Sequence, residues 1–366
     1  MMLLLVEDNV SDQENCKHAV EDFNEDNSEL KVILKICGSV TEAEDQLKTS
    51  DFDGVIIDMK LTSAGMDDGN QVIKKIQENF NRIPVVIMTG TPHLAEQNDF
   101  PLIKVYQKGD ITYNQIIQQF FSIYRTGLTR IMGGRGVIEK VLATIFTKNL
   151  LPAVMNNYPV DGNIEETNWV KYAKDDAKRT EKALLRYTLN HLLQHLDSDV
   201  SQCYPEEMYI FPPIDNRINT GCLLKKKDSD QYYIVMNPAC DLAERSNGSC
   251  NTDRVFLVEI QSIKDIYSNF DWDNLSSNNK KEVERIYKNN KSLYYHWLPK
   301  TDFYQGGIIN FRRVFTYTED EINDLFNTPE IQISAPFLKD MISRFSSYYA
   351  RQGQPDIDIT FAGQEV

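Results

Sequence analysis

Five polar residues follow short apolar segments near the start of this chain, and their types suit phosphoryl chemistry. They are Glu7, Asp8, Asp58, Thr89 and Lys108. Clustered carboxylates repel one another unless a hard cation such as Mg²⁺, which prefers oxygen ligands, neutralises them. Beside such an ion a carboxylate can attack a phosphoryl group and form an aspartyl phosphate. A lysine and a hydroxyl can then bind the phosphoryl oxygens.

The segments before these residues predict the elements that position them. Five short apolar runs alternate with stretches of helical spacing: Leu3–Val6, Val32–Ile36, Gly54–Ile57, Ile83–Met88 and Leu102–Tyr106. Such alternation predicts an α/β fold whose parallel strands are covered by helices on both faces. Five units fit a doubly wound, five-stranded parallel sheet of flavodoxin-like order. Because functional groups gather at the carboxyl ends of the strands, we expect the five polar residues to converge on one edge.

Four motifs at these positions resemble the receiver domain of two-component response regulators. They are LLVEDN (Leu4–Asn9), VIIDMKL (Val55–Leu61), PVVIMTGT (Pro84–Thr91) and YQKGD (Tyr106–Asp110). The resemblance covers residues 1–125, about a third of the chain. It implies a phosphorelay protein that takes its phosphoryl group from a sensor histidine kinase and catalyses its own phosphorylation and dephosphorylation.

The resemblance also implies a role for each residue of the cluster. By position, Asp58 is the phosphoacceptor, and Glu7 and Asp8 bind Mg²⁺ together with Asp58. Thr89 is the switch hydroxyl, and Lys108 contacts the phosphoryl group.

The chain departs from the family pattern in three places. Gly109 stands where the family has a proline after the lysine. The loop after Asp58 is longer than usual and adds acids, including Asp67 and Asp68. Val105 occupies the usual place of an aromatic switch residue, and Tyr106 is displaced from it by one position. Between Thr89 and Lys108 we expect one weak helix, at residues 93–98. These differences put the family's usual output surface in question.

The remaining two thirds of the chain predict two further regions. Residues 126–200 read as a helical linker and a dimerisation region, with a loop at residues 159–163 and Pro152 ending its first helix. It holds two apolar stripes on which copies of the chain could associate, one of Ile138, Val141, Leu142, Ile145 and Phe146 and one of Leu185, Leu189, Leu192 and Leu196. Residues 201–366 read as an α+β output domain of unknown function that ends in a packing helix over residues 336–351.

Charge and composition limit the classes of partner. The chain has 54 acidic and 39 basic residues, a formal net charge of −15, which disfavours DNA binding because duplex affinity comes largely from Lys and Arg. No run approaches the roughly 20 apolar residues of a membrane span. The six cysteines include no CxxC pair, which argues against a zinc ribbon or a disulfide framework. We therefore expect a cytoplasmic protein whose output acts through a downstream protein partner or a homodimer.

Two other groups of residues have alternative interpretations. His191 and His195 are four residues apart and could share a metal, although a surface pair is favoured because a third ligand is missing. Cys240, Asp241 and the distant His296 could form a thiol-type site, which would make the chain a receiver-regulated enzyme. We favour instead a Cys240 that is buried as a small apolar residue, with Asp241 capping a turn. A transcription factor of atypical fold is a third alternative.

Overall fold

The computed structural model describes residues 1–61, 68–79, 81–95, 102–134, 136–155, 167–196, 202–243, 250–351 and 353. The chain divides into two compact units, Met1–Asp199 and Val200–Val366, which we describe separately. No helix among the described residues is long and apolar enough to cross a membrane.

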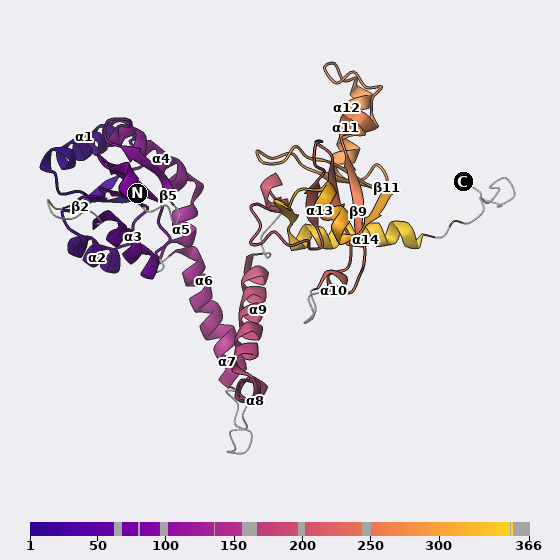
Figure 1. The fold of residues 1–366 in the computed structure, drawn as a ribbon, viewed down its shortest axis with the longest axis horizontal. Helices are drawn as coiled ribbons and strands as arrows, with labels where there is room; N and C mark the ends of the chain where they lie inside the picture. The colour runs from indigo at the N-terminus through magenta and orange to yellow at the C-terminus, as the bar shows by residue number, and fades with distance from the viewer. Residues whose placement is uncertain are drawn as a thin grey trace, which may run out of the picture. The chain divides into compact units, whose positions relative to one another are not determined.

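The first unit contains the predicted five-stranded parallel sheet (Figure 1). Its strand order is β2-β1-β3-β4-β5, and each neighbouring pair is parallel. This flavodoxin-like order confirms the fold expected from the alternating apolar runs. The strands are β1 (Met2–Val6), β2 (Ile33–Cys37), β3 (Gly54–Ile57), β4 (Val85–Thr89) and β5 (Leu102–Gln107).

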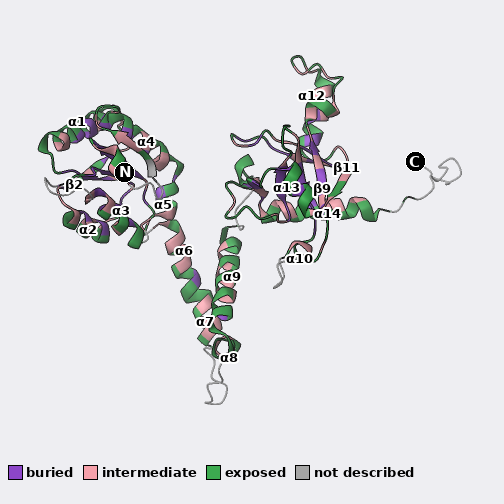
Figure 2. Ribbon diagram, viewed as in Figure 1, coloured by how far each residue is buried: buried purple, intermediate pink, exposed green. Residues whose placement is uncertain are grey.

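Helices cover both faces of this sheet because side chains alternate along each strand. Leu4 and Val6 of β1 pack with α2 (Val40–Thr49) and α3 (Asp68–Glu78). Leu3 and Leu5 pack on the opposite face with α1 (Val10–Asp26) and α4 (Tyr113–Thr126). Figure 2 shows the buried residues concentrated in the sheet between these helices.

A close contact joins α4 to the middle strand. Gly54 opens β3 beneath the Phe120 ring, and a Cβ added there would lie 2.7 Å from Phe120 Cδ1. The absence of a side chain at Gly54 therefore lets the fully buried Phe120 pack directly on the sheet.

The connection between β4 and β5 differs from the expected helix at residues 93–98. Its described part holds a single 3₁₀ turn, η1 (Pro92–Leu94), and residues 96–98 lie outside the described residues. Pro92 at the start of the turn suits this short element, because its missing N–H would be unpaired there anyway.

A helical hairpin follows the sheet within the first unit (Figure 1). Pro152 does not end its first helix as expected. A π-helical turn, Phe146–Leu150, shifts the hydrogen bonding by one residue, so the proline falls in the first turn of α7, where no N–H is needed. The helices are α5 (Leu128–Met132), α6 (Val137–Ile145), α7 (Leu151–Met155), α8 (Asn168–Asp175) and α9 (Ala177–Leu196). The loop expected at residues 159–163 lies outside the described residues.

The second unit is an α+β domain, as expected, built on a seven-stranded sheet of order β10-β11-β9-β8-β7-β12-β6. The paired strands run antiparallel. The strands are β6 (Tyr209–Ile210), β7 (Cys222–Lys225), β8 (Tyr232–Val235), β9 (Val255–Gln261), β10 (Tyr295–Leu298), β11 (Gly307–Tyr317) and β12 (Ile331–Ile333). The helical turns and helices are η4 (Pro205–Met208), α10 (Ala239–Leu242), α11 (Ile263–Ile266), α12 (Ser277–Tyr287), α13 (Glu319–Leu325) and α14 (Ala335–Ala350).

The final helix, α14, packs on one face of this sheet, which confirms its expected role. Met341 is fully buried, and Phe337, Phe345 and Tyr348 pack around it against the strands. The opposite face is covered by Ile322 of α13 and by neighbouring loop residues.

His296 lies inside the second unit, on β10. It is 3% exposed, and its Nδ1 lies 3.9 Å from Asp340 Oδ2 of α14. Burial, together with the positive charge of Arg344, lowers the pKa of His296 from 6.5 to about 4. At neutral pH the imidazole is therefore uncharged, and its approach to Asp340 is not an ion pair.

We expect the second unit to lose stability in mild acid because of this histidine. Between pH 6.5 and about 4 the unfolded chain binds a proton at His296 that the folded chain does not. The free energy of unfolding should therefore fall by about 3 kcal/mol as the pH drops through this window. Urea unfolding on a Trp169→Phe background, reported by Trp272 and Trp297, measures the change. His296→Gln should lose this part of the pH dependence, and parallel pH profiles for the two proteins would contradict the assignment.

Candidate functional site

Backbone hydrogen bonds hold the predicted site residues at one edge of the parallel sheet. The Glu7 N–H donates to Cys37 O at 3.0 Å, and the Asp58 N–H donates to Val6 O at 2.9 Å. The Lys108 N–H donates to Thr89 O at 2.9 Å. These bonds continue the ladders just beyond the strand ends, so the register of the sheet fixes each side chain.

The Lys108 ammonium joins three carboxylates at this edge. Its Nζ donates to Glu7 Oε2 at 2.7 Å, to Asp12 Oδ2 at 2.7 Å and to Asp58 Oδ2 at 2.9 Å. Glu7 is 1% exposed and Asp58 is 8% exposed, so both acids lie largely out of water. Unpaired carboxylates in this position would be costly, and the ammonium supplies the neutralising charge.

The surroundings raise the pKa of two groups in this cluster. Burial raises the pKa of Glu7 above its usual value, although the hydrogen bond from Lys108 opposes this change. Burial alone would lower the pKa of Lys108, but its hydrogen bonds to Asp12, Glu7 and Asp58 outweigh burial and raise it above the usual value. The lysine is therefore protonated at neutral pH.

The acids at this edge form a group that fits a divalent cation. Carboxylate oxygens of Glu7, Asp8 and Asp58 all lie within 4.8 Å of one another. Asp8 is exposed, so the group opens to solvent on its side. An all-oxygen set with one open side suits Mg²⁺, which binds through a few carboxylates and keeps several waters.

Asp12 is a member of the cluster that the sequence analysis did not identify. It lies in the first turn of α1, whose N-terminus is capped by the Asn9 side chain. Gln13 of the same turn donates its side-chain N–H to Glu7 O at 2.7 Å. The available signal was an acid shortly after the acidic strand end, in the first turn of the helix that follows Asn9.

Thr89 lies at the end of β4 and is 1% exposed. Its Oγ1 accepts a hydrogen bond from the Thr91 N–H at 3.2 Å and lies 3.4 Å from Thr91 Oγ1. The structure therefore places this hydroxyl against Thr91, beside the strand that leads to Lys108.

The residues that depart from the family pattern have clear places in the fold. Gly109 has a φ of +100°, a backbone conformation that a proline could not adopt. Val105 packs on the sheet face of α2 and α3, whereas Tyr106 packs on the opposite face with α4 and accepts a hydrogen bond from Gln119 at 2.7 Å. The one-residue displacement thus moves the aromatic ring to the other face of the sheet.

The helix that follows the site packs tightly on the Asp58 strand end. Gly69, the second residue of α3, lies so close that a Cβ there would be 2.7 Å from Met59 Cα and 2.8 Å from Asp58 O. The Leu61 N–H also donates to Asp68 Oδ2 at 3.2 Å. Asp67 lies outside the described residues.

The thiol-type constellation is not assembled in the structure. Cys240 is exposed on α10, so the expectation that it is buried is wrong, and its Sγ lies 3.6 Å from Asp241 Oδ1. The short helix α10 follows β8 at the surface of the second unit. Among the described residues, no apolar side chains cover Cys240 there. The His296 imidazole instead lies in the interior, beside Asp340 and Arg344 of α14.

The histidine pair lies in the helical hairpin. The two rings line a hollow between α9 and α6, together with Val141, Ile145 and Asn149. His191 Nδ1 is 2.8 Å from Tyr187 O, one turn earlier in the same helix. Among the described residues, the group of three or more potential metal ligands is the acidic one at Asp58, not this pair.

Comparison with solved structures finds response regulators over the first third of the chain. A CheY-like receiver domain from Methylobacillus flagellatus is 22% identical, over 33% of this chain and 98% of that chain, with a TM-score of 0.25. The N-terminal domain of a response regulator/sensory box/GGDEF protein from Carboxydothermus hydrogenoformans is 18% identical, over 35% and 99%, with a TM-score of 0.27. A response regulator from Thermotoga maritima, in complex with Mg²⁺ and BeF, is 14% identical, over 33% and 97%, with a TM-score of 0.27.

No family model matches the chain, and no curated protein matches it. The strand order of the parallel sheet and the convergence of Glu7, Asp58 and Lys108 agree with the resemblance seen in the sequence motifs.

We expect Lys108→Met to destabilise the first unit by about 2–3 kcal/mol, because it leaves buried carboxylates without a counter-charge. Added Mg²⁺ should restore part of the loss, whereas Asp58→Asn, which removes one repelling charge, should be at least as stable as wild type without metal. Thermal unfolding in EDTA and in Mg²⁺ measures both effects. A Lys108→Met protein as stable as wild type in EDTA would show that the ammonium does not neutralise the cluster.

Proposed function

We propose that the first unit is a receiver that takes a phosphoryl group from a sensor histidine kinase onto Asp58, with Mg²⁺ bound by Glu7, Asp8 and Asp58. The observation that supports this proposal is the Lys108 ammonium within hydrogen-bond distance of both Glu7 and Asp58, at the carboxyl edge of a parallel sheet. The sequence motifs that contain these residues also support the proposal that Asp58 accepts the phosphoryl group. The chain is then a response regulator, and its second unit is the output domain.

The described residues divide the work of phosphoryl transfer. A carboxylate oxygen of Asp58 attacks phosphorus, and the bond between phosphorus and the donor's imidazole nitrogen breaks. Bound Mg²⁺ would supply positive charge to the phosphoryl oxygens during the transfer. Lys108 then shifts one hydrogen bond from Asp58 to a phosphoryl oxygen and keeps Glu7 as its partner.

Thr89 is the second group that can respond to the new phosphoryl group. Its oxygen accepts a bond from the Thr91 N–H, so its own proton is available for a phosphoryl oxygen. A turn of this hydroxyl would pull on residues 89–95, which hold only a 3₁₀ turn in their described part. The signal then passes through this short connection rather than through an aromatic ring, because Tyr106 is fixed on the opposite face by Gln119.

The output acts through protein contacts in the cytoplasm rather than through DNA. The chain's net charge of −15 opposes a duplex. In the hairpin, the basic residues Lys174 and Lys178 flank Asp175 and Asp176, which is typical of a solvated helix face. Downstream partners are therefore another protein or a second copy of the chain.

Incubation with acetyl phosphate and Mg²⁺ should add one phosphoryl group to the chain, detected by intact-mass spectrometry. Asp58→Asn should abolish the gain because the amide cannot form the acyl phosphate. Asp45→Asn, which removes an exposed acid of α2, is the matched control and should label like wild type. Equal labelling of wild type and Asp58→Asn would refute the acceptor assignment.

Asp12→Asn should lengthen the lifetime of the aspartyl phosphate. Asp12 holds the Lys108 ammonium at 2.7 Å and adds negative charge beside the phosphoryl site. Without it the ammonium is free to bind the phosphoryl oxygens, and an interaction of 0.5–1 kcal/mol corresponds to a change of about two- to fivefold. Loss of label after removal of acetyl phosphate measures the lifetime. Glu14→Gln, on the exposed side of the same turn, should leave it unchanged, and a shorter lifetime for Asp12→Asn would contradict this role.

A further inference from the structure

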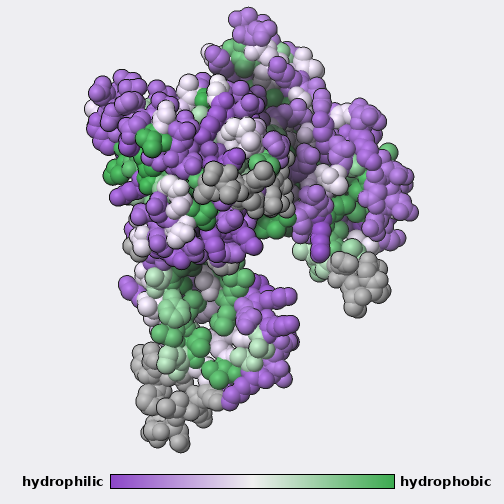
Figure 3. Space-filling model, turned by 60° about the vertical axis from the view of Figure 1, so that its left-hand side comes forward, coloured by the Kyte–Doolittle hydropathy of each residue, from purple (hydrophilic) through white to green (hydrophobic). Residues whose placement is uncertain are grey.

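In the part of the chain that the structure describes, helix α9 of the hairpin carries an exposed apolar stripe. Leu185, Leu189, Leu193 and Leu196 of α9 are 60%, 47%, 53% and 55% exposed. Their spacing of four, four and three residues places them along one side of the helix, and we call them the α9 stripe. In Figure 3 hydrophobic residues colour the lower part of the molecule, where this hairpin lies. The sequence had assigned Leu192 to this stripe, but Leu192 is half-buried and Leu193 takes its place.

A different face of α9 already packs within the hairpin. Thr180 is buried, and Leu184, Leu192 and His191 are half-buried on the side toward α6. Each leucine of the α9 stripe lies next in sequence to a position of this face, so the stripe is rotated by about 100° around the helix axis. A helix with two adjacent apolar faces is typical of a four-helix bundle, in which each helix contacts two neighbours.

The hairpin alone buries too little to be an independent structure. Within residues 137–155 and 167–196, the fully buried side chains are Ile145 and Thr180. Figure 2 shows the hairpin almost entirely in the colours of exposed and half-buried residues. Two helices packed only on each other are marginal in water, because most helical stability comes from tertiary packing of an apolar face. The four exposed leucines are the surface that could supply it.

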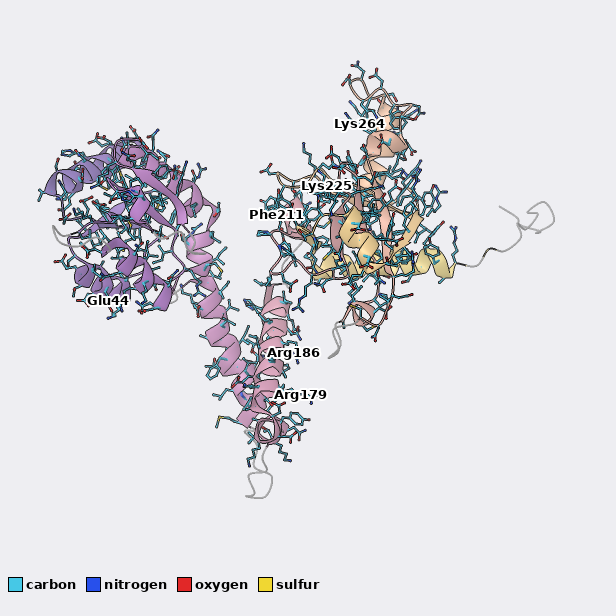
Figure 4. The ribbon with its side chains drawn as sticks, viewed as in Figure 1. Glu44, Arg179, Arg186, Phe211, Lys225 and Lys264 are labelled. Carbon is cyan, nitrogen blue, oxygen red and sulfur yellow. The ribbon has the colours of Figure 1, made fainter. Side chains whose placement is uncertain are left out.

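The charge of the hairpin differs from that of the chain as a whole. Residues 137–155 and 168–196 contain eight Lys and Arg against four Asp and Glu, a net charge of +4, whereas the whole chain carries −15. The ten residues Tyr187–Leu196 contain none of these four residue types. Arg179 and Arg186, labelled on α9 in Figure 4, lie before this uncharged half. Two copies that meet along this uncharged half would bring no like charges together there.

We propose that the α9 stripe is a self-association surface, on which the hairpins of two copies form a four-helix bundle in a constitutive dimer. A second copy is the occupant that fits, because an uncharged row of leucines complements the same row about a twofold axis. It offers no charge pattern that would select a different protein. The hollow between α6 and α9 is lined by Val141 and Ile145 of the other apolar stripe, at residues 138–146, so these two residues face α9, whereas Phe146 of that stripe is 53% exposed.

Light scattering on the unphosphorylated full chain tests this proposal. The wild type should have twice the 42.3 kDa mass of one chain. Leu189→Glu/Leu193→Glu should have the mass of one chain, because two copies would bury four carboxylates at the contact. Leu293→Glu, at a leucine of the second unit that is 55% exposed, is the matched control and should stay dimeric. The wild-type mass should not fall between about 50 and 500 mM salt, since screening weakens charged contacts and not apolar ones.

Three results would overturn the proposal: a wild type with the mass of one chain, a double variant that stays dimeric, or a dimer that salt dissociates. Labelling by acetyl phosphate should be the same in the double variant and wild type, which shows that the receiver is folded. Asp58→Asn should be dimeric, so failure of the dimer and failure of the phosphoacceptor assignment are separate outcomes.

Discussion

The first unit depends on one charge balance, the Lys108 ammonium among the carboxylates of Glu7, Asp12 and Asp58. These groups come from the ends of β1, β3 and β5 and from the first turn of α1, and the parallel sheet brings them together. Because Glu7 and Asp58 are buried, the fold could not hold both without a neighbouring cation. In the function proposed above, the same concentration of negative charge would bind the metal ion and attack phosphorus. Stability and chemistry therefore share one set of residues.

The two units use apolar packing in different ways. In the first, alternating side chains of β1 supply both faces of the sheet, so helices on either side are fixed by a single strand. In the second, an antiparallel sheet is closed on one face by α14, whose aromatic residues fill the space above the strands. The hairpin has neither kind of core, which sets it apart from both sheets. It buries few side chains, and the α9 stripe is exposed.

The sequence predicted the first unit well because its signals are local. Continuous apolar runs marked each parallel strand, and the polar residues at their ends converge as expected. Asp12 was missed because its role depends on how the first turn of α1 meets Lys108, nearly a hundred residues later. Pro152 was misjudged because a π-helical turn cannot be read from residue types. In the second unit β7, β10 and β12 are three or four residues long, too short to stand out, and the exposure of Cys240 depends on how its loop packs.

Gly69 limits how the first unit could be altered by protein engineering. Its missing side chain lets α3 start directly against the backbone of Asp58 and Met59. A loop taken from another receiver could replace the residues before it only if the graft ends in a glycine at this point. Any other residue would push α3 away from the end of β3 and would displace the Asp58 carboxylate. The length of that loop is thus open to change, while the position where it ends is not.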